Sequence, residues 1–422
     1  MPSRRTNTAR SAAIRFFAMA KWEPISSSAR PMRTSWQVAS TRSAMPLRRQ
    51  GMILRPAGSD RSYFRKPPIN PLLLRASQAE TGREARRRRL LSEASVRMTT
   101  VYITIDTEYS SGFCNGPGPV DRAENFARSI ACLTPEGPAG ITHKLKLLNE
   151  HGQKAVFFVD PMPALQWGVA AIEDIVAPIL EAGQDVQLHC HTEWLALVGA
   201  ANPLGDRTGR NIKDFTFEEQ CVLLAWARDT LVAAGAPKPV AFRAGNYGAN
   251  DDTLRALAAI GMRYDSSHCP ALVGSGDNAI ALSAQDQRTM LYEGVIEVPV
   301  GCIGALGGSL RHAQLTALTL QEMLAAIRHA KAQDMNSFTL VSHSFELINR
   351  RKLAVNRIVR RRFAGLLREL SQMEGVETGT YAETPPLLAG NQRPATPLPP
   401  SPIRTGMRYA EQAVSNALYG AL

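Results

Sequence analysis

From residue 101 onward, short apolar runs alternate along the chain with longer stretches in which apolar residues recur at every third or fourth position. Short apolar runs bounded by turn residues predict buried strands, and the longer spacing predicts amphipathic helices. Strands that alternate with helices form a mostly parallel sheet that the helices cover. The pattern therefore predicts an α/β fold.

The apolar pattern assigns each predicted element to a part of the chain. Predicted strands span residues 101–106, 155–160, 185–191, 240–244, 263–266, 296–300 and 338–343, with a further strand near 376–381. Predicted helices span residues 140–151, 169–182, 216–234, 250–261, 319–333 and 352–373. Several of these helices precede a glycine that can cap a helix in the left-handed conformation, as at Gly152 and Gly183.

The formal net charge of +12 comes entirely from the beginning of the chain. Residues 1–97 contain 21 basic and 5 acidic side chains, whereas the rest of the chain is slightly acidic. This leader is rich in Arg, Ser and Pro and keeps no helical or strand period, so we predict that it is disordered. We interpret it as an over-extended start before a native Met98, with a targeting or nucleic-acid-binding segment as the alternative, and expect no nucleic-acid partner.

The composition after the last predicted strand changes again. Prolines cluster in residues 384–422, as in a linker, so we predict a folded domain over residues 98–383 and a short amphipathic helix over residues 407–422. No apolar run approaches the roughly 18 residues of a membrane span. The six cysteines show neither C-x-x-C nor zinc-knuckle spacing, which favours reduced thiols and a cytoplasmic location.

Two carboxylates, Asp106 and Glu108, follow the first predicted strand. Because side chains alternate between the two faces of a strand, both carboxylates point the same way. Such a pair suits a metal ion or an acid/base pair, although an Asp at a strand end also forms caps and turns. The carboxyl ends of parallel strands share one edge, so polar residues from other strand ends are expected nearby.

The third strand ends in His189, His191 and Glu193. A single His in a strand is usually a core residue, but ligand-type side chains at this density favour a metal site. Because the two imidazoles are two positions apart, they lie on one side of the strand.

Later strands end in three further candidates. Arg243 precedes a Gly-containing loop and can orient a carboxylate through a bidentate pair or form a structural ion pair. Asp265 ends the next strand. His343 ends an apolar strand and is placed for proton transfer if it faces the same edge.

An Asp, a His pair, an Arg loop, an Asp strand and a lone His occur in an order that resembles the polysaccharide deacetylase family, the NodB-homology fold of carbohydrate esterase family 4. The likeness covers residues 100–345. It implies a distorted (β/α) barrel of about seven parallel strands. It also implies a divalent metal ion, zinc first with cobalt or manganese as alternatives, and hydrolysis of acetyl groups on carbohydrates.

The chain departs from the family's motifs at two metal positions. The usual T-F-D-D-G is T-I-D-T-E here, which makes Asp106 the implied catalytic base and Glu108 the implied metal carboxylate. The usual H-[ST]-x-x-H aligns His189 with its first His and Glu193 with its second. Either Glu193 replaces a His ligand or His191 supplies the second nitrogen, and the preference of zinc for imidazole favours His191.

The resemblance also implies the remaining roles. Arg243 orients the catalytic Asp, Asp265 matches the fourth motif, and His343 matches the general acid of the fifth. We expect the hydroxyl of Tyr247 or a nearby backbone N–H to bind the oxyanion. Asn246 is expected to bind substrate beside it. Trp194 is expected to stack on a sugar ring, with packing in the core as the alternative.

Two other functions remain open. The altered motifs also suit a glycan-binding or regulatory pseudoenzyme, and related barrels hydrolyse other C–N bonds such as cyclic amides. The expected partner is an acetylated carbohydrate or a small amide, and no protein partner is deducible. Seven Lys and Arg residues between 350 and 362 are interpreted as a solvated helix face, with binding of an anionic glycan or phosphate as the alternative.

Overall fold

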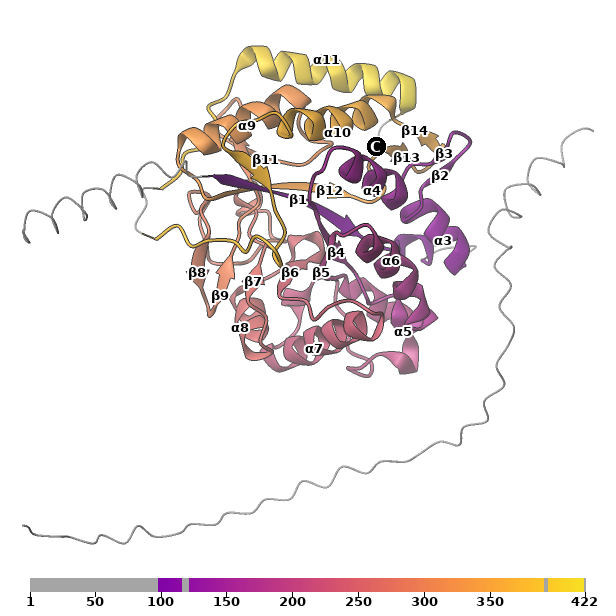
Figure 1. Ribbon diagram of the computed structural model, residues 1–422. Coiled ribbons are helices and arrows are strands. Elements are labelled where there is room, and N and C mark those ends of the chain that lie inside the picture. Colours follow the sequence, from indigo (N-terminus) through magenta and orange to yellow (C-terminus); the bar gives the residue numbers. More distant parts are fainter. Residues whose placement is uncertain (1–97, 116–120, 391–393, 421–422) are drawn as a thin grey trace, which may run out of the picture. The chain divides into compact units, whose positions relative to one another are not determined.

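The computed structural model describes residues 98–115, 121–390 and 394–420. The predicted leader over residues 1–97 lies outside the described residues. In the described part, strands and helices alternate as the apolar pattern predicts, and the strands form a mostly parallel sheet that curls into a distorted barrel (Figure 1). The predicted α/β fold class is confirmed.

The main sheet has nine strands, which include every strand predicted from the apolar pattern. They are β1 (Thr99–Thr107), β4 (Val156–Val159), β5 (Asp185–Cys190), β6 (Ala241–Ala244), β7 (Tyr264–Asp265), β8 (Met290–Tyr292), β9 (Val295–Glu297), β12 (Ser337–His343) and β15 (Val376–Thr378). Their order is β12-β1-β4-β5-β6-β7-β9-β8, and β15 also pairs with β1. Every pairing is parallel except that of β8 with β9.

The sheet curls because the chain that follows β9 returns to pair with β12. Val300 forms a parallel bridge with Thr339, and Gln314 forms one with Val341. The backbone N–H of Leu315 donates to the carbonyl oxygen of Val341 at 2.9 Å. These bonds bring the two sides of the sheet together, so the carboxyl ends of its parallel strands surround one interior.

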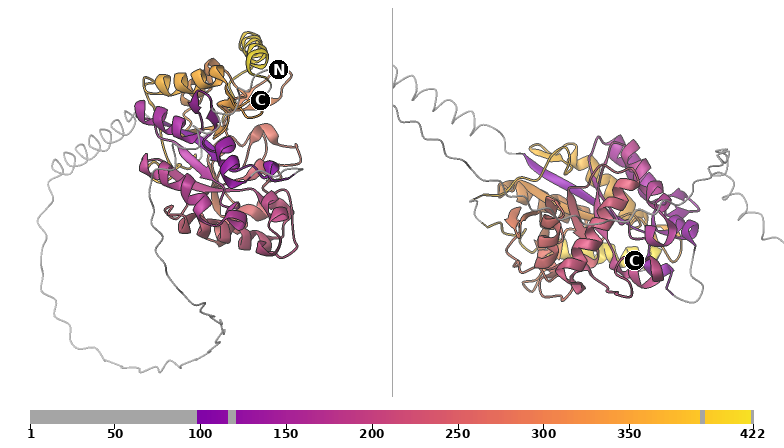
Figure 2. Two further views of the ribbon diagram at one scale, coloured as in Figure 1. Left: turned by 90° about the vertical axis from the view of Figure 1, so that its right-hand side faces the viewer. Right: turned by 90° about the horizontal axis from the view of Figure 1, so that it is seen from below.

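Helices pack on the outer face of the curled sheet (Figure 2). They are α3 (Arg122–Ser129), α4 (Ile141–Glu150), α5 (Ala164–Trp167), α6 (Ala170–Glu181), α7 (Phe217–Ala233), α8 (Asp251–Ala259), α9 (Leu320–Ala332), α10 (Arg357–Leu370) and α11 (Pro402–Tyr419). Each predicted helix is present. Helix α10 begins at Arg357 rather than at residue 352 because the side chain of Asn356 caps it, accepting from the N–H of Val359 at 3.2 Å.

Short elements connect the larger ones. The hairpins are β2 (Leu133–Thr134) with β3 (Gly137–Pro138), β10 (Cys302–Gly304) with β11 (Leu310–His312), and β13 (Ile348–Asn349) with β14 (Ala354–Val355). The 3-10 helices are η1 (Ser111–Phe113), η2 (Thr192–Leu197), η3 (Gly199–Ala201), η4 (Ile212–Asp214), η5 (Gly245–Tyr247) and η6 (Pro270–Leu272). Within the described ranges, no helix has both the length and the apolar surface needed to cross a membrane.

Successive side chains of β1 point alternately to the core beneath the helices and to the interior of the barrel. Val101, Ile103 and Ile105 belong to the large core between sheet and helices, whereas Tyr102 belongs to a second cluster inside the curl. Asp106 has the same parity as Tyr102, so its carboxylate enters the interior at the carboxyl end of the strand. Aromatic and apolar side chains fill the other end of this interior, which leaves the carboxyl end for polar groups.

The last described residues pack on the barrel through α11, which lies over α9 and α10 (Figure 1). Its Arg408 forms an ion pair with Glu322 of α9, and both side chains are largely buried. Its Glu411 pairs with Arg362 of α10. The predicted helix in this tail is present and begins at Pro402 rather than at residue 407.

We expect Arg408→Met to lower the free energy of unfolding by about 3 kcal/mol, because it leaves the buried carboxylate of Glu322 without a partner. Detachment of α11 would relieve that charge, so the variant should also be cleaved faster between the barrel and α11 in limited proteolysis. Arg404→Met in the same helix is the control, because the guanidinium of Arg404 donates to the carbonyl oxygen of Pro399 and pairs with no carboxylate in the described part of the chain. Equal stability and cleavage in both variants would contradict this role.

Candidate active site

Side chains from four strands meet at the carboxyl end of the barrel interior. Asp106 of β1 lies opposite His343 of β12 in the parallel register, and His189 of β5 lies opposite Arg243 of β6. Alternation within each strand points these residues to the interior, while their neighbours pack against the helices. The sheet thus brings together residues that are far apart in the sequence.

Glu108, His189 and His191 form a cluster whose potential ligand atoms all lie within 4.8 Å of one another. The Nε2 atoms of His189 and His191 lie 3.2 Å and 2.5 Å from Oε2 of Glu108. This oxygen is buried, and neither nitrogen makes a well-aligned hydrogen bond to it. One carboxylate and two imidazoles that converge in this way are a donor set suited to a divalent ion such as zinc.

The other ring nitrogens of the two histidines have protein partners. Nδ1 of His189 lies 2.7 Å from the carbonyl oxygen of Arg243, and Nδ1 of His191 lies 3.0 Å from Oε2 of Glu193. Such contacts leave Nε2 free to ligate, and they orient the ring. Glu193 therefore contacts the outer side of His191 rather than joining the cluster. This geometry favours His191 over Glu193 as the residue that completes the donor set with Glu108 and His189.

Electrostatics within the cluster stabilise the form of Glu108 that can bind a cation. Burial raises the pKa of Glu108, but the charge of His191 and the contacts with both imidazoles more than offset it and hold the pKa well below its usual value. Glu193 is held in turn by the side-chain amide of Asn246, whose Nδ2 donates to Oε1 of Glu193 at 2.7 Å. Asn246 thus supports the cluster from outside.

Arg243 is fully buried and fixes the carboxylate of Asp106. Its Nη1 donates to Oδ1 of Asp106 at 2.9 Å and to Oγ1 of Thr104 at 2.7 Å. Its Nε and Nη2 donate to the carbonyl oxygen and the hydroxyl of Ser266. Its guanidinium carbon lies over the ring of Phe158, 4.5 Å from the ring centroid. With each nitrogen engaged, Arg243 holds Oδ1 and leaves Oδ2 of Asp106 facing His343.

His343 lies between two carboxylates. Its Nε2 is 3.9 Å from Oδ2 of Asp106, and its Nδ1 is 3.0 Å from Oε1 of Glu346. Burial lowers the pKa of His343, but the hydrogen bond and charge of Glu346, together with Asp106, raise it above the ordinary value for an imidazole. Glu346 responds in the opposite direction, because His343 outweighs the effect of burial and lowers the pKa of Glu346 to about 2.

Lys144 of α4 supports the strand that carries His343. Its Nζ donates to Oγ of Ser342 at 2.5 Å and to the carbonyl oxygen of His343 at 2.7 Å. Burial lowers the pKa of Lys144 to about 8 despite the nearby charge of Glu346. Oγ of Ser342 donates in turn to Oε2 of Glu346 at 3.0 Å, so lysine, serine and glutamate form one network beneath the imidazole.

Neither Glu346 nor Lys144 was predicted from the sequence. For Glu346 a signal exists, since a carboxylate three residues after a candidate acid can contact it in a tight turn. For Lys144 none exists, because a lysine in an amphipathic helix normally predicts a solvated face. Asp160, at the end of β4, was also missed; it is fully buried, and burial raises its pKa to about 7.

Asp265 is placed differently from the other predicted site residues. It accepts from the hydroxyl of Ser267 at 2.7 Å and lies opposite the buried Glu297 in the register of β7 and β9. Burial raises the pKa of both Asp265 and Glu297. The neighbouring Asp265 raises the pKa of Glu297 further, whereas the hydrogen bond with Glu297 partly offsets the effect of burial on Asp265. No hydrogen bond or ion pair joins Asp265 to Asp106 or to Arg243 among the described residues.

The predicted substrate-binding residues fall into two groups. The hydroxyl of Tyr247 is buried near the site without a hydrogen-bond partner among the described groups, and its ring packs against Cys269 and Val300. Trp194, in contrast, is fully buried and packs edge-on against Trp167 with 5.3 Å between ring centroids. The ring of Trp194 therefore offers no face to a sugar, and the structure assigns it to the core.

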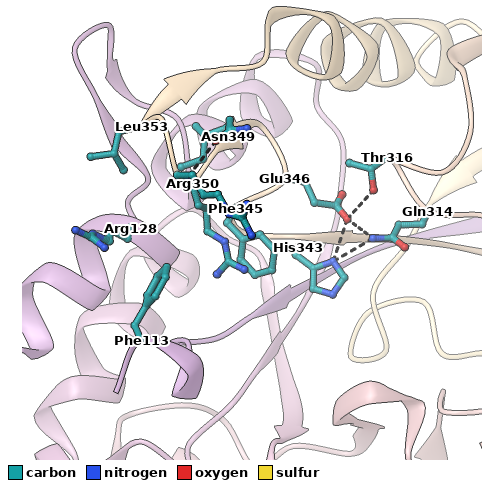
Figure 3. Close-up of a pocket in the computed structure, with 12 residues that line it drawn as sticks. Phe113, Arg128, Gln314, Thr316, His343, Phe345, Glu346, Asn349, Arg350 and Leu353 are labelled. Carbon is teal, nitrogen blue, oxygen red and sulfur yellow. Dashed lines mark hydrogen bonds and ion pairs between the residues drawn. The ribbon is translucent and has the colours of Figure 1, made fainter. Parts of the chain in front are cut away.

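A cavity of about 790 Å³ opens beside His343 (Figure 3). His343 and Glu346 lie at one end of it, Phe113 and Arg128 lie at the other, and Arg350 lies between them. The remaining lining residues are Gln314, Thr316, Phe345, Ile348, Asn349, Arg351 and Leu353. The volume lies within the range of binding sites for small organic ligands.

No protein-family model and no curated protein matches this chain. Among solved structures, it resembles a candidate polysaccharide deacetylase from Mycobacterium smegmatis at 17% identity and a TM-score of 0.45, over 73% of this chain and 96% of that one. It resembles a family 4 carbohydrate esterase from Streptomyces lividans at 12% identity and a TM-score of 0.33, over 71% and 98%. It also resembles a 4-alpha-glucanotransferase from Thermococcus litoralis at 12% identity and a TM-score of 0.42, over 72% and 42%.

The arrangement of the cluster predicts how metal binding responds to substitution. His191→Ala should abolish binding of one equivalent of zinc, because it removes a convergent nitrogen. Glu193→Gln should weaken zinc binding by about 10- to 100-fold, as expected for a residue that orients a ligand. Metal analysis and calorimetry measure both, with His151→Ala at the end of α4 as control. Loss of zinc in the Glu193 variant alone would make Glu193 the ligand instead.

The contact between Glu346 and His343 predicts a change in titration. The carboxylate stabilises the charged imidazole, so Glu346→Gln should lower the pKa of His343, because burial, which disfavours the charged form, is then less strongly opposed. Titration of the imidazole by NMR measures this shift. Glu181→Gln removes an exposed carboxylate of α6 and should leave the titration unchanged. An unshifted pKa in the Glu346 variant would contradict the assigned pairing.

Proposed function

We propose that this protein is a divergent polysaccharide deacetylase that hydrolyses an acetyl group from a carbohydrate or glycoconjugate with the aid of a divalent metal ion. The observation that carries the proposal is the position of Asp106, held by Arg243 and facing His343, on the same interior edge as the Glu108, His189 and His191 cluster. The order of the sequence motifs supports the choice of substrate.

Glu108, His189 and His191 would hold the ion, with zinc as first choice and cobalt or manganese as alternatives. When bound, such an ion polarises the acyl oxygen and makes a neighbouring water more acidic. Glu193 and the carbonyl oxygen of Arg243 keep the two imidazoles oriented for this task.

Asp106 acts as the base. Its Oδ1 is occupied by Arg243, so Oδ2 is the oxygen available to accept the proton of the attacking water. The hydrogen bond from the buried guanidinium fixes the carboxylate and keeps it from rotating away from His343. The carboxylate therefore stays at a fixed distance from the imidazole of His343 and can accept a proton there.

His343 acts as the acid. Glu346 favours the charged imidazole, so Nε2 carries a proton that it can donate to the leaving nitrogen or oxygen as the bond to the acyl carbon breaks. The unpartnered hydroxyl of Tyr247 is a donor for the oxyanion or for a substrate hydroxyl. We further propose a cytoplasmic location, which the six free thiols support.

We expect Asp106→Asn and His343→Ala to lower turnover by about 10²- to 10⁴-fold with unchanged metal content, since each removes a proton-transfer group. His189→Ala should lose both metal and activity. Acetate release from a panel of acetylated glycans, with added divalent ions and a chelator control, measures turnover, and His151→Ala is the reference variant. Full activity in the Asp106 and His343 variants would refute these roles, and glycan binding without any acetate release by the native protein would favour a pseudoenzyme.

A further inference from the structure

Positive charge dominates the lining of the cavity beside His343. Its charged members are Arg128, Arg350, Arg351 and Glu346, apart from His343 itself. The carboxylate of Glu346 is almost completely buried and already contacts His343. Arg128 forms an ion pair with Glu124 one turn earlier in α3. The charges of the remaining arginines are therefore not balanced by the cavity wall.

Arg350 is the cation best placed to bind a ligand in this cavity. Its guanidinium carbon lies 3.9 Å from the ring centroid of Phe345 and 5.3 Å from that of Phe113 (Figure 3). The side chain is half-buried, and no carboxylate or carbonyl accepts a hydrogen bond from it among the described residues. The guanidinium thus lies over two aromatic rings, neither of which accepts a conventional hydrogen bond from its N–H groups.

An arginine in this environment is poorly solvated but still able to donate. Burial lowers the pKa of Arg350, and the carboxylate of Glu108 is near enough to act in the opposite direction. Contact with two aromatic rings restricts the motion of the planar guanidinium, which reduces the entropy lost when a ligand binds. The free N–H edges match the oxygen pairs of a carboxylate or a phosphate.

The fold distinguishes Arg350 from the other basic residues that follow His343. Arg357 and Arg360 lie on α10 and contact Glu136 at 3.2 Å and 3.8 Å, and Arg362 pairs with Glu411 of α11. The charges of these three arginines are therefore already neutralised by carboxylates of the fold. Arg350 instead lies in the turn between β13 and β14, where it enters the cavity beside the acid.

We propose that this cavity binds an anionic substituent of the substrate, a carboxylate or a phosphate, and that Arg350 determines this specificity. The inference rests on the proposed function, because it places the anionic group beside the acetylated position that His343 serves. Arg351 adds positive charge at the same wall and attracts the anion without a rigid contact of its own.

Three probes based on the same N-acetylated sugar test whether the cavity prefers a carboxylate, a phosphate or neither. N-acetylglucosamine is neutral, N-acetylmuramic acid adds a carboxylate, and N-acetylglucosamine 6-phosphate adds a phosphate. Calorimetry measures the affinity of each probe, and acetate release measures its turnover, for the native protein, for Arg350→Gln and for Arg361→Gln. The last variant removes the same charge from an exposed position of α10 outside the cavity lining.

We expect the native protein to bind at least one anionic probe about tenfold or more tightly than the neutral one, as a charge-assisted hydrogen bond predicts. The Arg350 variant should lose this preference and bind the neutral probe as before, and the Arg361 variant should keep the preference. The probe that is preferred identifies carboxylate or phosphate.

Equal affinity for all three probes, or a preference that survives in Arg350→Gln, would overturn the inference. Acetate release without an anionic preference would refute the inference and leave the proposed function standing. A preference that depends on Arg350, without acetate release from any acetylated glycan, would support the anion site and refute the proposed function.

Discussion

The buried guanidinium of Arg243 connects the two halves of the site. Its nitrogens hold Asp106 and Thr104 of β1 and Ser266 after β7, while its own carbonyl oxygen positions His189 of β5. Burying this charge is costly, and only a full set of partners compensates for it. The same contacts that satisfy the arginine therefore also orient one proposed base and one proposed metal ligand.

Positively and negatively charged side chains alternate along a series that begins at Arg243 and includes the proposed base and the proposed acid. The cation of Arg243 faces Asp106, Asp106 faces His343, His343 faces Glu346, and Lys144 lies behind Glu346. Glu346 and Asp106 favour the charged imidazole of His343, and His343 and Lys144 in turn favour the ionised carboxylate of Glu346. This order suits a reaction in which one group accepts a proton and the other donates one.

Periodicity in the sequence was sufficient to predict the parallel strands of the sheet and the edge at which the site lies, but not the antiparallel strand β8. The apolar runs predicted every strand that carries Asp106, His189, Arg243 and His343, and two-residue spacing placed Glu108 with Asp106. The sequence-based prediction was wrong where tertiary packing, rather than the local pattern of residue types, decides whether a side chain reaches the site. Trp194 has an aromatic ring of the type that stacks on sugars, but it lies in the core because Trp167 and its neighbours enclose it.

The sequence by itself determined the α/β class, the strands and the parity that turns polar side chains toward one interior, because strand geometry repeats every two residues. Only the tertiary structure decided which polar residues meet. Lys144 comes from a distant helix, Glu346 and Arg350 come from turns after β12, and no local period specifies where such side chains point. Their positions follow from the curl of the sheet and the packing of its loops.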